Sequence, residues 1–163
     1  MMDRIEALSQ IDRPILGDTV PLSVFRIFRQ FSALHAEEIL GTMGSRVVFQ
    51  HAGRQLGIDV GKSVYTEDLD EYLKNIFQFV EDSGIGILSV TTNDEGQMIF
   101  KLDECITCAG MPNIGKKICH FEVGIVSGAV EVFLGESVGA IESKCNANGD
   151  DFCEVTITPK KHG

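Results

Sequence analysis

The stretch ICHFEVGIVSGAVEVFLG, residues 118–135, decides how the rest of the chain can pack. It is apolar on almost every side, and Gly124 and Gly128 lie four residues apart within it. A helix at a protein surface carries one apolar stripe, whereas a helix that is apolar all round is buried on more than one side. We therefore predict a buried helix here, with the two glycines allowing another element to approach closely.

Segments with the period of β-strands lie on both sides of this helix. Residues 86–92 (GILSVTT) and 98–104 (MIFKLDE) flank the loop 93–97 (NDEGQ), a pattern typical of a β-hairpin with a glycine-containing loop. Residues 137–144 (SVGAIESK) and 152–159 (FCEVTITP) predict a second hairpin that closes the chain.

The chain before these strands has helical spacing of apolar residues. Residues 21–61 predict helix that is broken or bent at Gly41 and Gly44. Thr66 precedes a third helical segment, residues 67–83, whose acidic first turn suits the positive end of a helix.

These elements predict one domain over residues 1–163, because no linker, low-complexity tract or repeat divides the chain. Residues 1–85 are expected to be mainly helical, and residues 86–158 to hold the sheet, the buried helix and a cysteine-rich hairpin. The predicted fold class is therefore α+β, with N-terminal helices followed by a small antiparallel sheet into which one buried helix is inserted.

Charge and cysteine usage limit the possible partners. The chain has 24 acidic and 14 basic residues, a net charge of −10, which disfavours binding to nucleic acid and to anionic membranes. The first residues contain no long apolar run, so we expect a cytoplasmic protein. The chain has five cysteines, an odd number, and free thiols or metal ligands are then expected in place of a disulfide framework.

Two of the cysteines bracket a turn in ESKCNANGDDFCEV, residues 142–155. A hairpin can bring Cys145 close to Cys153, and Cys119 at the start of the buried helix supplies a third thiol. Zinc in structural sites takes four ligands, commonly thiolates with histidine or carboxylate. The pattern indicates either a metal site or buried thiols that behave as small apolar side chains.

Glu142 can join such a site only if its strand is irregular. Glu142 and Cys145 are an odd number of residues apart, so a regular strand would point them to opposite faces. We therefore predict that the strand bulges near Ser143 and Lys144 if both residues reach one ion.

Cys105 and Cys108 form a C-x-x-C pair in the loop before the helix. Three interpretations remain open for them: a redox pair, two ligands of an all-cysteine site with Cys145 and Cys153, or loop thiols without a role.

The stretch from Glu104 to Ile157 resembles a 4-vinyl reductase domain. The shared features are the E-C-x-x-C segment, a cysteine that opens an apolar glycine-containing helix, and the ending C-x-x-x-G-D-x-x-C-x-V, and the likeness extends over about residues 86–158. The family includes small archaeal proteins and the sensor domains of phenol-responsive transcription activators. Its fold is shared with vesicle-tethering subunits of the TRAPP type and with haem-based nitric oxide sensors.

The resemblance implies a zinc site. In the phenol sensors, zinc is held by a cysteine at the helix start, a glutamate, a cysteine three residues later and a cysteine eight residues further on. Cys119, Glu142, Cys145 and Cys153 match this order. Such a site has no open position, so its zinc is structural, and Cys105 and Cys108 lie outside the set.

The resemblance also implies a ligand pocket between the helices and the sheet. Two pocket positions that are aromatic in the phenol sensors correspond to Val123 and Ala140, so a pocket here would be more apolar. We expect a small-molecule-binding or sensor-type domain with a structural zinc and an unknown hydrophobic ligand. The alternatives are a reductase-like enzyme or enzyme subunit acting on a tetrapyrrole or other hydrophobic cofactor, and a protein-interaction module. The lack of a dinucleotide-binding motif weighs against the enzyme.

The N-terminal helical segment predicts a homodimer. Its apolar residues crowd onto more than one face: Leu22, Val24, Phe25, Ile27, Phe28, Phe31 and Leu34. Related sensors and tethering subunits pair through their helices, and two-fold pairing is the commonest way to cover an apolar surface.

Overall fold

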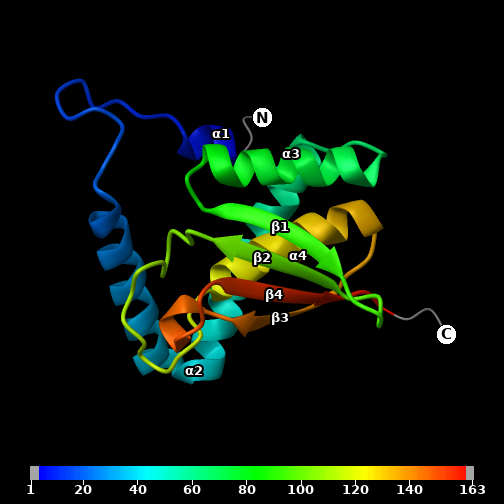
Figure 1. Ribbon diagram of the computed structural model, residues 1–163. Coiled ribbons are helices and arrows are strands. Elements are labelled where there is room, and N and C mark those ends of the chain that lie inside the picture. The colour runs from blue at the N-terminus through cyan, green and yellow to red at the C-terminus, as the bar shows by residue number, and fades with distance from the viewer. Residues whose placement is uncertain (1–3, 161–163) are drawn as a thin grey trace.

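The computed structural model describes residues 4–160, and it confirms the predicted α+β fold (Figure 1). The elements are α1 (Arg4–Leu8), α2 (Leu22–Ser63), α3 (Leu69–Asp82), β1 (Ile87–Thr92), β2 (Met98–Asp103), α4 (His120–Leu134), β3 (Gly139–Lys144), the short 3-10 helix η1 (Asn146–Asn148) and β4 (Cys153–Thr158).

The four strands form one antiparallel sheet in the order β1-β2-β4-β3. Both predicted hairpins are present, β1 with β2 and β3 with β4, and the central pair β2–β4 joins them. Phe100 of β2 lies opposite Val155 of β4, and Leu102 lies opposite Cys153. All four of these side chains are buried, so the inner face of the sheet continues without interruption from one hairpin to the other.

Helix α4 forms the middle layer of the molecule. It crosses one face of the sheet, and the second half of α2 lies on its far side (Figure 1). Every residue from Glu122 to Glu131 is buried, which confirms the prediction of a helix covered on more than one side. No helix within residues 4–160 is both long and apolar enough to span a membrane.

Glycines let α2 and α4 touch backbone to backbone. A Cβ atom added to Gly57 of α2 would collide with the carbonyl oxygen of Ile125, and one added to Gly128 of α4 would collide with that of Arg54. Gly53 and Gly124 are in the same situation. The expectation that Gly124 and Gly128 admit another element is therefore confirmed, and the element is the second half of α2.

Helix α2 bends sharply at Gly41, the one residue between Leu22 and Ser63 with non-helical backbone angles (φ 72°, ψ 166°). The predicted break therefore occurs at Gly41, and Gly44 continues the helix. The first half of α2 extends beside the body of the protein (Figure 1). Arg26 fastens it there, because its Nε donates to the backbone oxygen of Ile106 at 2.7 Å.

Helix α3 begins at Leu69, later than the acidic segment alone would place it, because the Asp68 side chain caps it by accepting the Glu71 N–H at 2.9 Å. Its buried residues face the sheet edge and α4, and the hydroxyl of Tyr72 donates to the backbone oxygen of Ala129 at 2.7 Å.

Methyl groups introduced at the helix contact should push α2 and α4 apart. We expect Gly57→Ala and Gly128→Ala each to lower the free energy of unfolding by about 1–3 kcal/mol, since overpacking costs that much in a close-packed interior. Urea unfolding followed by circular dichroism measures the change. Gly139→Ala is the control, because its added Cβ would lie 3.6 Å from the nearest atom. Equal stability of all three variants would contradict the close helix contact.

Candidate metal centre

Four chain segments converge at one end of the sheet, and each brings a cysteine. Cys105 follows the end of β2, Cys119 caps the start of α4, Cys145 follows the end of β3, and Cys153 is the first residue of β4. Because β4 is antiparallel to both β2 and β3, its first residue lies at the same end of the sheet as their last residues. Cysteines that are far apart in the sequence therefore meet at this end of the sheet.

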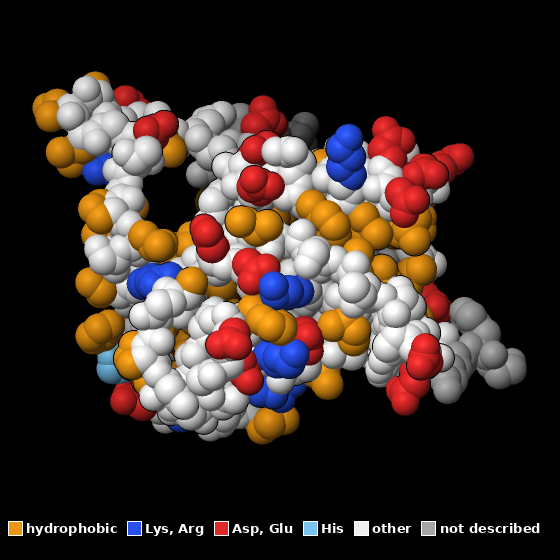
Figure 2. Space-filling view, viewed as in Figure 1, with side chains coloured by type: hydrophobic (Ala, Val, Ile, Leu, Met, Phe, Trp, Pro, Cys, Tyr) orange, Lys and Arg blue, Asp and Glu red, His pale blue; other side chains and the backbone are white. Residues whose placement is uncertain are grey.

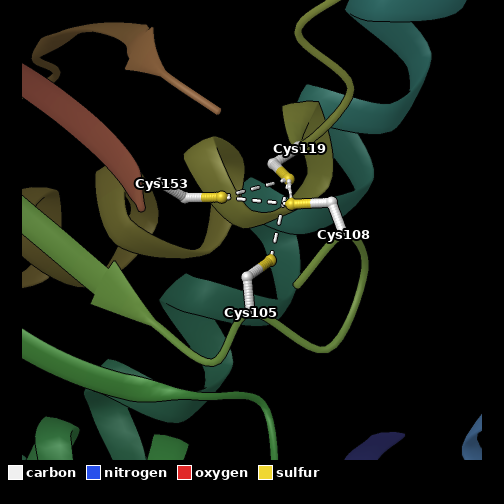
Figure 3. A group of neighbouring side chains, drawn as sticks. All are labelled: Cys105, Cys108, Cys119 and Cys153. Atoms are coloured by element: carbon white, nitrogen blue, oxygen red, sulfur yellow. Dashed lines mark hydrogen bonds between the residues drawn. The ribbon is translucent and has the colours of Figure 1, made fainter. Parts of the chain in front are cut away.

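All five cysteines are reduced and buried, and each contacts at least one other; Figure 3 shows four of them. We call these residues, together with Glu142, the cysteine centre. The Sγ–Sγ distances are 3.1 Å for Cys108–Cys153, 3.3 Å for Cys108–Cys119, 3.7 Å for Cys105–Cys119, 3.8 Å for Cys119–Cys145, 3.8 Å for Cys119–Cys153 and 3.9 Å for Cys108–Cys145.

The possible ligands fall into two groups that share Cys119. In the first, the sulfur atoms of Cys105, Cys108, Cys119 and Cys153 lie within 4.8 Å of one another. In the second, Cys119, Glu142 and Cys145 meet the same limit. The four residues expected from the sequence are thus divided between the groups, and their joint ligation of one ion stays a prediction. Cys105 and Cys108, which the sequence left unassigned, point into the centre.

The expected bulge in β3 is present. Glu142 pairs with Val155, but Lys144 pairs with Glu154, so Ser143 is an extra residue in the ladder. The Ser143 hydroxyl holds this irregularity by donating to the backbone oxygen of Glu154 at 3.2 Å. The bulge turns Glu142 and the following cysteine toward the same interior, as the odd spacing requires.

The Glu142 carboxylate lies against the start of α4. Both of its oxygens accept the Cys119 N–H, at 3.1 and 3.2 Å, and Oε2 is 3.4 Å from His120 Nδ1. Burial raises the pKa of Glu142 to about 7, because removal from water disfavours the charged carboxylate. The group is therefore close to balance between its two protonation states near neutral pH.

The thiols share protons through S–H donation. Hydrogen bonds from Cys108 and its neighbours lower the pKa of Cys105 and of Cys145, because they stabilise the thiolate form. The pKa values of Cys108, Cys119 and Cys153 are raised, because these thiols donate to their neighbours and are removed from water. A thiolate stabilised in this way is the form of cysteine that binds a metal ion.

A tight turn after β2 directs Cys105 and Cys108 inward. Glu104 adopts a left-handed conformation (φ 52°), which is uncommon for a residue other than glycine. The N–H groups of Cys108 and Ala109 then both donate to the Cys105 carbonyl, at 3.2 and 2.9 Å. The sequence contains no local signal for this turn.

Sequence reasoning missed two polar residues that support the centre. Asp150 accepts the Cys145 N–H at 2.9 Å and so fixes the turn after β3. The Asn146 amide oxygen accepts S–H contacts from Cys153 at 3.6 Å and from Cys108 at 3.8 Å. Both lie in the segment NANGD, whose Asn, Gly and Asp residues predicted a turn but gave no sign of contact with the thiols.

Known proteins with the same elements identify the family. Residues 98–159 match the family model of the V4R domain. The uncharacterized protein MJ0150 of Methanocaldococcus jannaschii is 33% identical over 144 residues, which are 87% of this chain and 78% of that protein. This chain belongs to the V4R domain family. The family expected from the cysteine and glycine pattern, the 4-vinyl reductase domain, is thereby confirmed.

Solved structures extend the V4R likeness at the level of the fold. The phenol-responsive sensory domain of the transcription activator PoxR, solved with phenol, has a TM-score of 0.62 at 15% identity, covering 88% of this chain and 76% of that one. A vinyl-4-reductase family protein from Methanocaldococcus jannaschii has a TM-score of 0.57 at 15% identity, covering 88% of this chain and 83% of that one. At these identities the comparisons show a shared fold.

The interior of this V4R domain is well filled where the sequence suggested a ligand. Val123 is buried in the core between α4 and the sheet, and Ala140 packs against the same core. The space that remains between α3, α4 and the sheet is about 20 Å³, which is far below the size of a ligand pocket. The assignment of Val123 and Ala140 to a pocket stays a prediction.

Proposed function

We propose that this V4R domain is a cytoplasmic small-molecule sensor-type domain whose cysteine centre holds one structural zinc ion. The fold supports the sensor role, because it is shared with the sensory domain of PoxR. The observation that carries the zinc proposal is the meeting of five buried thiols and a carboxylate from four chain segments. An ion at this position would fix α4, the loop after β2 and the β3–β4 hairpin to one another.

The spacing of the thiols fits a tetrahedral ion. With Zn–S bonds of about 2.3 Å, the ligands of a tetrahedral zinc lie about 3.8 Å apart. The six Sγ–Sγ contacts of the cysteine centre, 3.1 to 3.9 Å, approach this value. Thiolates with a carboxylate are donors that zinc accepts, and complete burial leaves no place for an exchangeable water. The role that follows is structural.

Two ligand sets would satisfy the ion. The set implied by the family resemblance is Cys119, Glu142, Cys145 and Cys153, whereas the four mutually close sulfur atoms belong to Cys105, Cys108, Cys119 and Cys153. Cys119 and Cys153 are common to both sets. The two sets carry the same charge, −4 with all ligands deprotonated, so zinc leaves a net −2 in either case.

Space for a small molecule lies outside the filled core. A cleft of about 470 Å³ opens between the two halves of α2 and the residues that lead into α4. We call it the α2 cleft; it is lined by Arg29, Ala33, Glu37, Thr42, Met43, Ser45, Arg46, Phe49, Lys116, Lys117, Ile118 and His120. Its volume is within the range of small-molecule sites, and His120 also contacts Glu142 of the cysteine centre. This cleft supports the ligand-binding part of the proposal.

The first half of α2 supports the proposed homodimer. Phe28 is 70% exposed and Phe31 is 60% exposed, and Ile27 and Leu34 are exposed beside them. Figure 2 shows hydrophobic side chains along the free edge of the molecule where this half of α2 lies. An apolar surface of this kind usually marks an interface, and a second copy of the chain is the partner that we propose.

Native mass spectrometry of the protein as purified tests the proposed function directly. We expect one zinc per chain together with a retained small molecule. If the protein contains zinc but binds no small molecule, the sensor proposal fails and a protein-interaction module is the remaining interpretation. A chain free of zinc would contradict the metal proposal.

Serine replacement identifies the zinc ligands. We expect Cys119→Ser and Cys153→Ser each to abolish zinc binding and to lower the midpoint of thermal unfolding by about 10 °C, because the free energy of binding a structural metal adds to folding stability. Acidification should release the zinc from the wild-type protein, since protons compete with the metal for thiolates. Zinc content is measured by elemental analysis.

Two double variants separate the ligand sets. Loss of zinc in Glu142→Gln/Cys145→Ser with retention in Cys105→Ser/Cys108→Ser would establish the set implied by the family. The reverse result would establish the four-sulfur set. Zinc retained in Cys119→Ser would rule out both.

Charged substitutions test the dimer. We expect the wild-type protein to be a dimer at micromolar concentration, and Phe28→Asp and Phe31→Asp to give monomers, because a buried uncompensated carboxylate opposes association. Light scattering coupled to size exclusion measures the mass. Ile141→Asp is the matched control, since Ile141 is 54% exposed on β3 and should leave the dimer intact. A monomeric wild-type protein would refute this interface.

A further inference from the structure

The α2 cleft differs in charge from the protein that contains it. The whole chain has a net charge of −10 with histidine neutral, but the side chains that line the cleft include four Lys or Arg residues and one histidine against one acidic residue. The basic residues are Arg29, Arg46, Lys116, Lys117 and His120, and the acidic residue is Glu37. Basic groups gathered in a concave site create a local positive potential and attract anions.

Two of these cations have no carboxylate partner. Within residues 4–160, neither Arg46 nor Lys117 forms an ion pair. Lys117 Nζ instead donates to two backbone oxygens, those of Glu142 at 3.1 Å and Ser143 at 2.7 Å. The neutral carbonyl groups do not cancel its positive charge, and the Asp150 carboxylate, whose pKa is lowered by a backbone N–H and also by this charge, forms no ion pair with it.

Arg29 is largely buried, stacks on Phe49 and forms an ion pair with Glu122. Its side chain is 11% exposed, and its guanidinium carbon lies 4.4 Å from the centre of the Phe49 ring. Its Nη2 is 3.7 Å from the Glu122 carboxylate, and this buried nitrogen has no hydrogen-bond acceptor among the described residues. Glu122 Oε2 is also buried without a hydrogen-bond donor, so this ion pair orients the guanidinium group beside the cleft.

The same cleft has apolar walls. Ala33, Met43, Phe49 and Ile118 contribute side chains from both halves of α2 and from the segment before α4. A purely inorganic anion would leave these apolar side chains in contact with water, whereas an apolar group attached to the anion would bury them.

We infer that the α2 cleft binds a small amphipathic anion, a carboxylate or phosphate group on an apolar body. The anionic group would lie among Arg29, Arg46 and Lys117, and the apolar body against Phe49 and Ile118. This inference rests on the proposed small-molecule function, and it names the site and the chemical class of the ligand. The neutral phenol of PoxR belongs to a different chemical class.

Calorimetric titration of the full-length protein with 1-naphthyl phosphate tests the inference, with 1-naphthol as the neutral counterpart and inorganic phosphate as the head group alone. We expect naphthyl phosphate to bind at least about tenfold more tightly than either, because both halves of the ligand contribute. Arg46→Gln and Lys117→Gln should each weaken naphthyl phosphate about tenfold and leave naphthol unchanged. Lys74→Gln is the matched control: it makes the same charge change on α3, outside the cleft, and should have no effect.

The outcomes separate the site from the function. Naphthol binding as tightly as naphthyl phosphate, with no effect of Arg46→Gln or Lys117→Gln, overturns the anion site while small-molecule binding by the domain stands. Equal weakening by Lys74→Gln shows that only the overall charge matters and also overturns it. No binding of naphthyl phosphate overturns it as well, and the sensor function itself fails only if naphthol is not bound and no small molecule is retained on purification. Circular dichroism and zinc content verify that the variants are folded.

Discussion

The backbone contact between α2 and α4 is the constraint on which the rest of this V4R domain depends. Glycines on both helices remove the side chains that would separate them, so the second half of α2 lies directly on the backbone of α4. Arg54 of α2 pairs with the buried Glu131 of α4 at 2.6 Å, which fixes one helix along the other. With one side of α4 occupied in this way, its other side faces the sheet, and its N-cap residue Cys119 lies at the end of the sheet where β2 and β3 finish.

The cysteine centre follows from that placement together with the order of the strands. The β2–β4 pairing brings the C-x-x-C loop to the start of β4, and the bulge in β3 turns Glu142 inward. Each of the segments supplies one or two ligands and none supplies a full set. A metal ion there would cross-link segments that are distant in sequence, and such a cross-link stabilises a small domain that has a limited core.

The sequence predicted the features that depend on local pattern. The period-two segments predicted both hairpins, the all-round apolar stretch predicted the buried helix, and the odd spacing of Glu142 and Cys145 predicted the bulge. The position of Cys105 and Cys108 could not be predicted in this way, because it depends on the left-handed turn at Glu104 and on pairing between β2 and β4.

The exposed apolar residues in the first half of α2 agree with the surface that the sequence predicted there, but the direction of the chain after the bend could not be predicted. Phe28 and Phe31 have the spacing of core residues, and only the bend at Gly41 separates them from the core. The bend is also what opens the α2 cleft, since the cleft is lined from both halves of the helix. The spacing of apolar residues predicts that a segment is helical, but it does not predict in which direction the helix continues after a bend.

Lys117 links the two sites through the β3 bulge. Its ammonium group donates to the carbonyls of Glu142 and Ser143, so the same side chain lines the cleft and braces the strand that presents the carboxylate. An anion that drew Lys117 toward itself would release those carbonyls, and the geometry around the metal would relax. Thermodynamic linkage makes such an effect reciprocal: whatever factor ligand binding applies to metal affinity, metal binding applies to ligand affinity. If the cysteine centre holds a metal and the α2 cleft an anion, as proposed, each would change the affinity of the domain for the other.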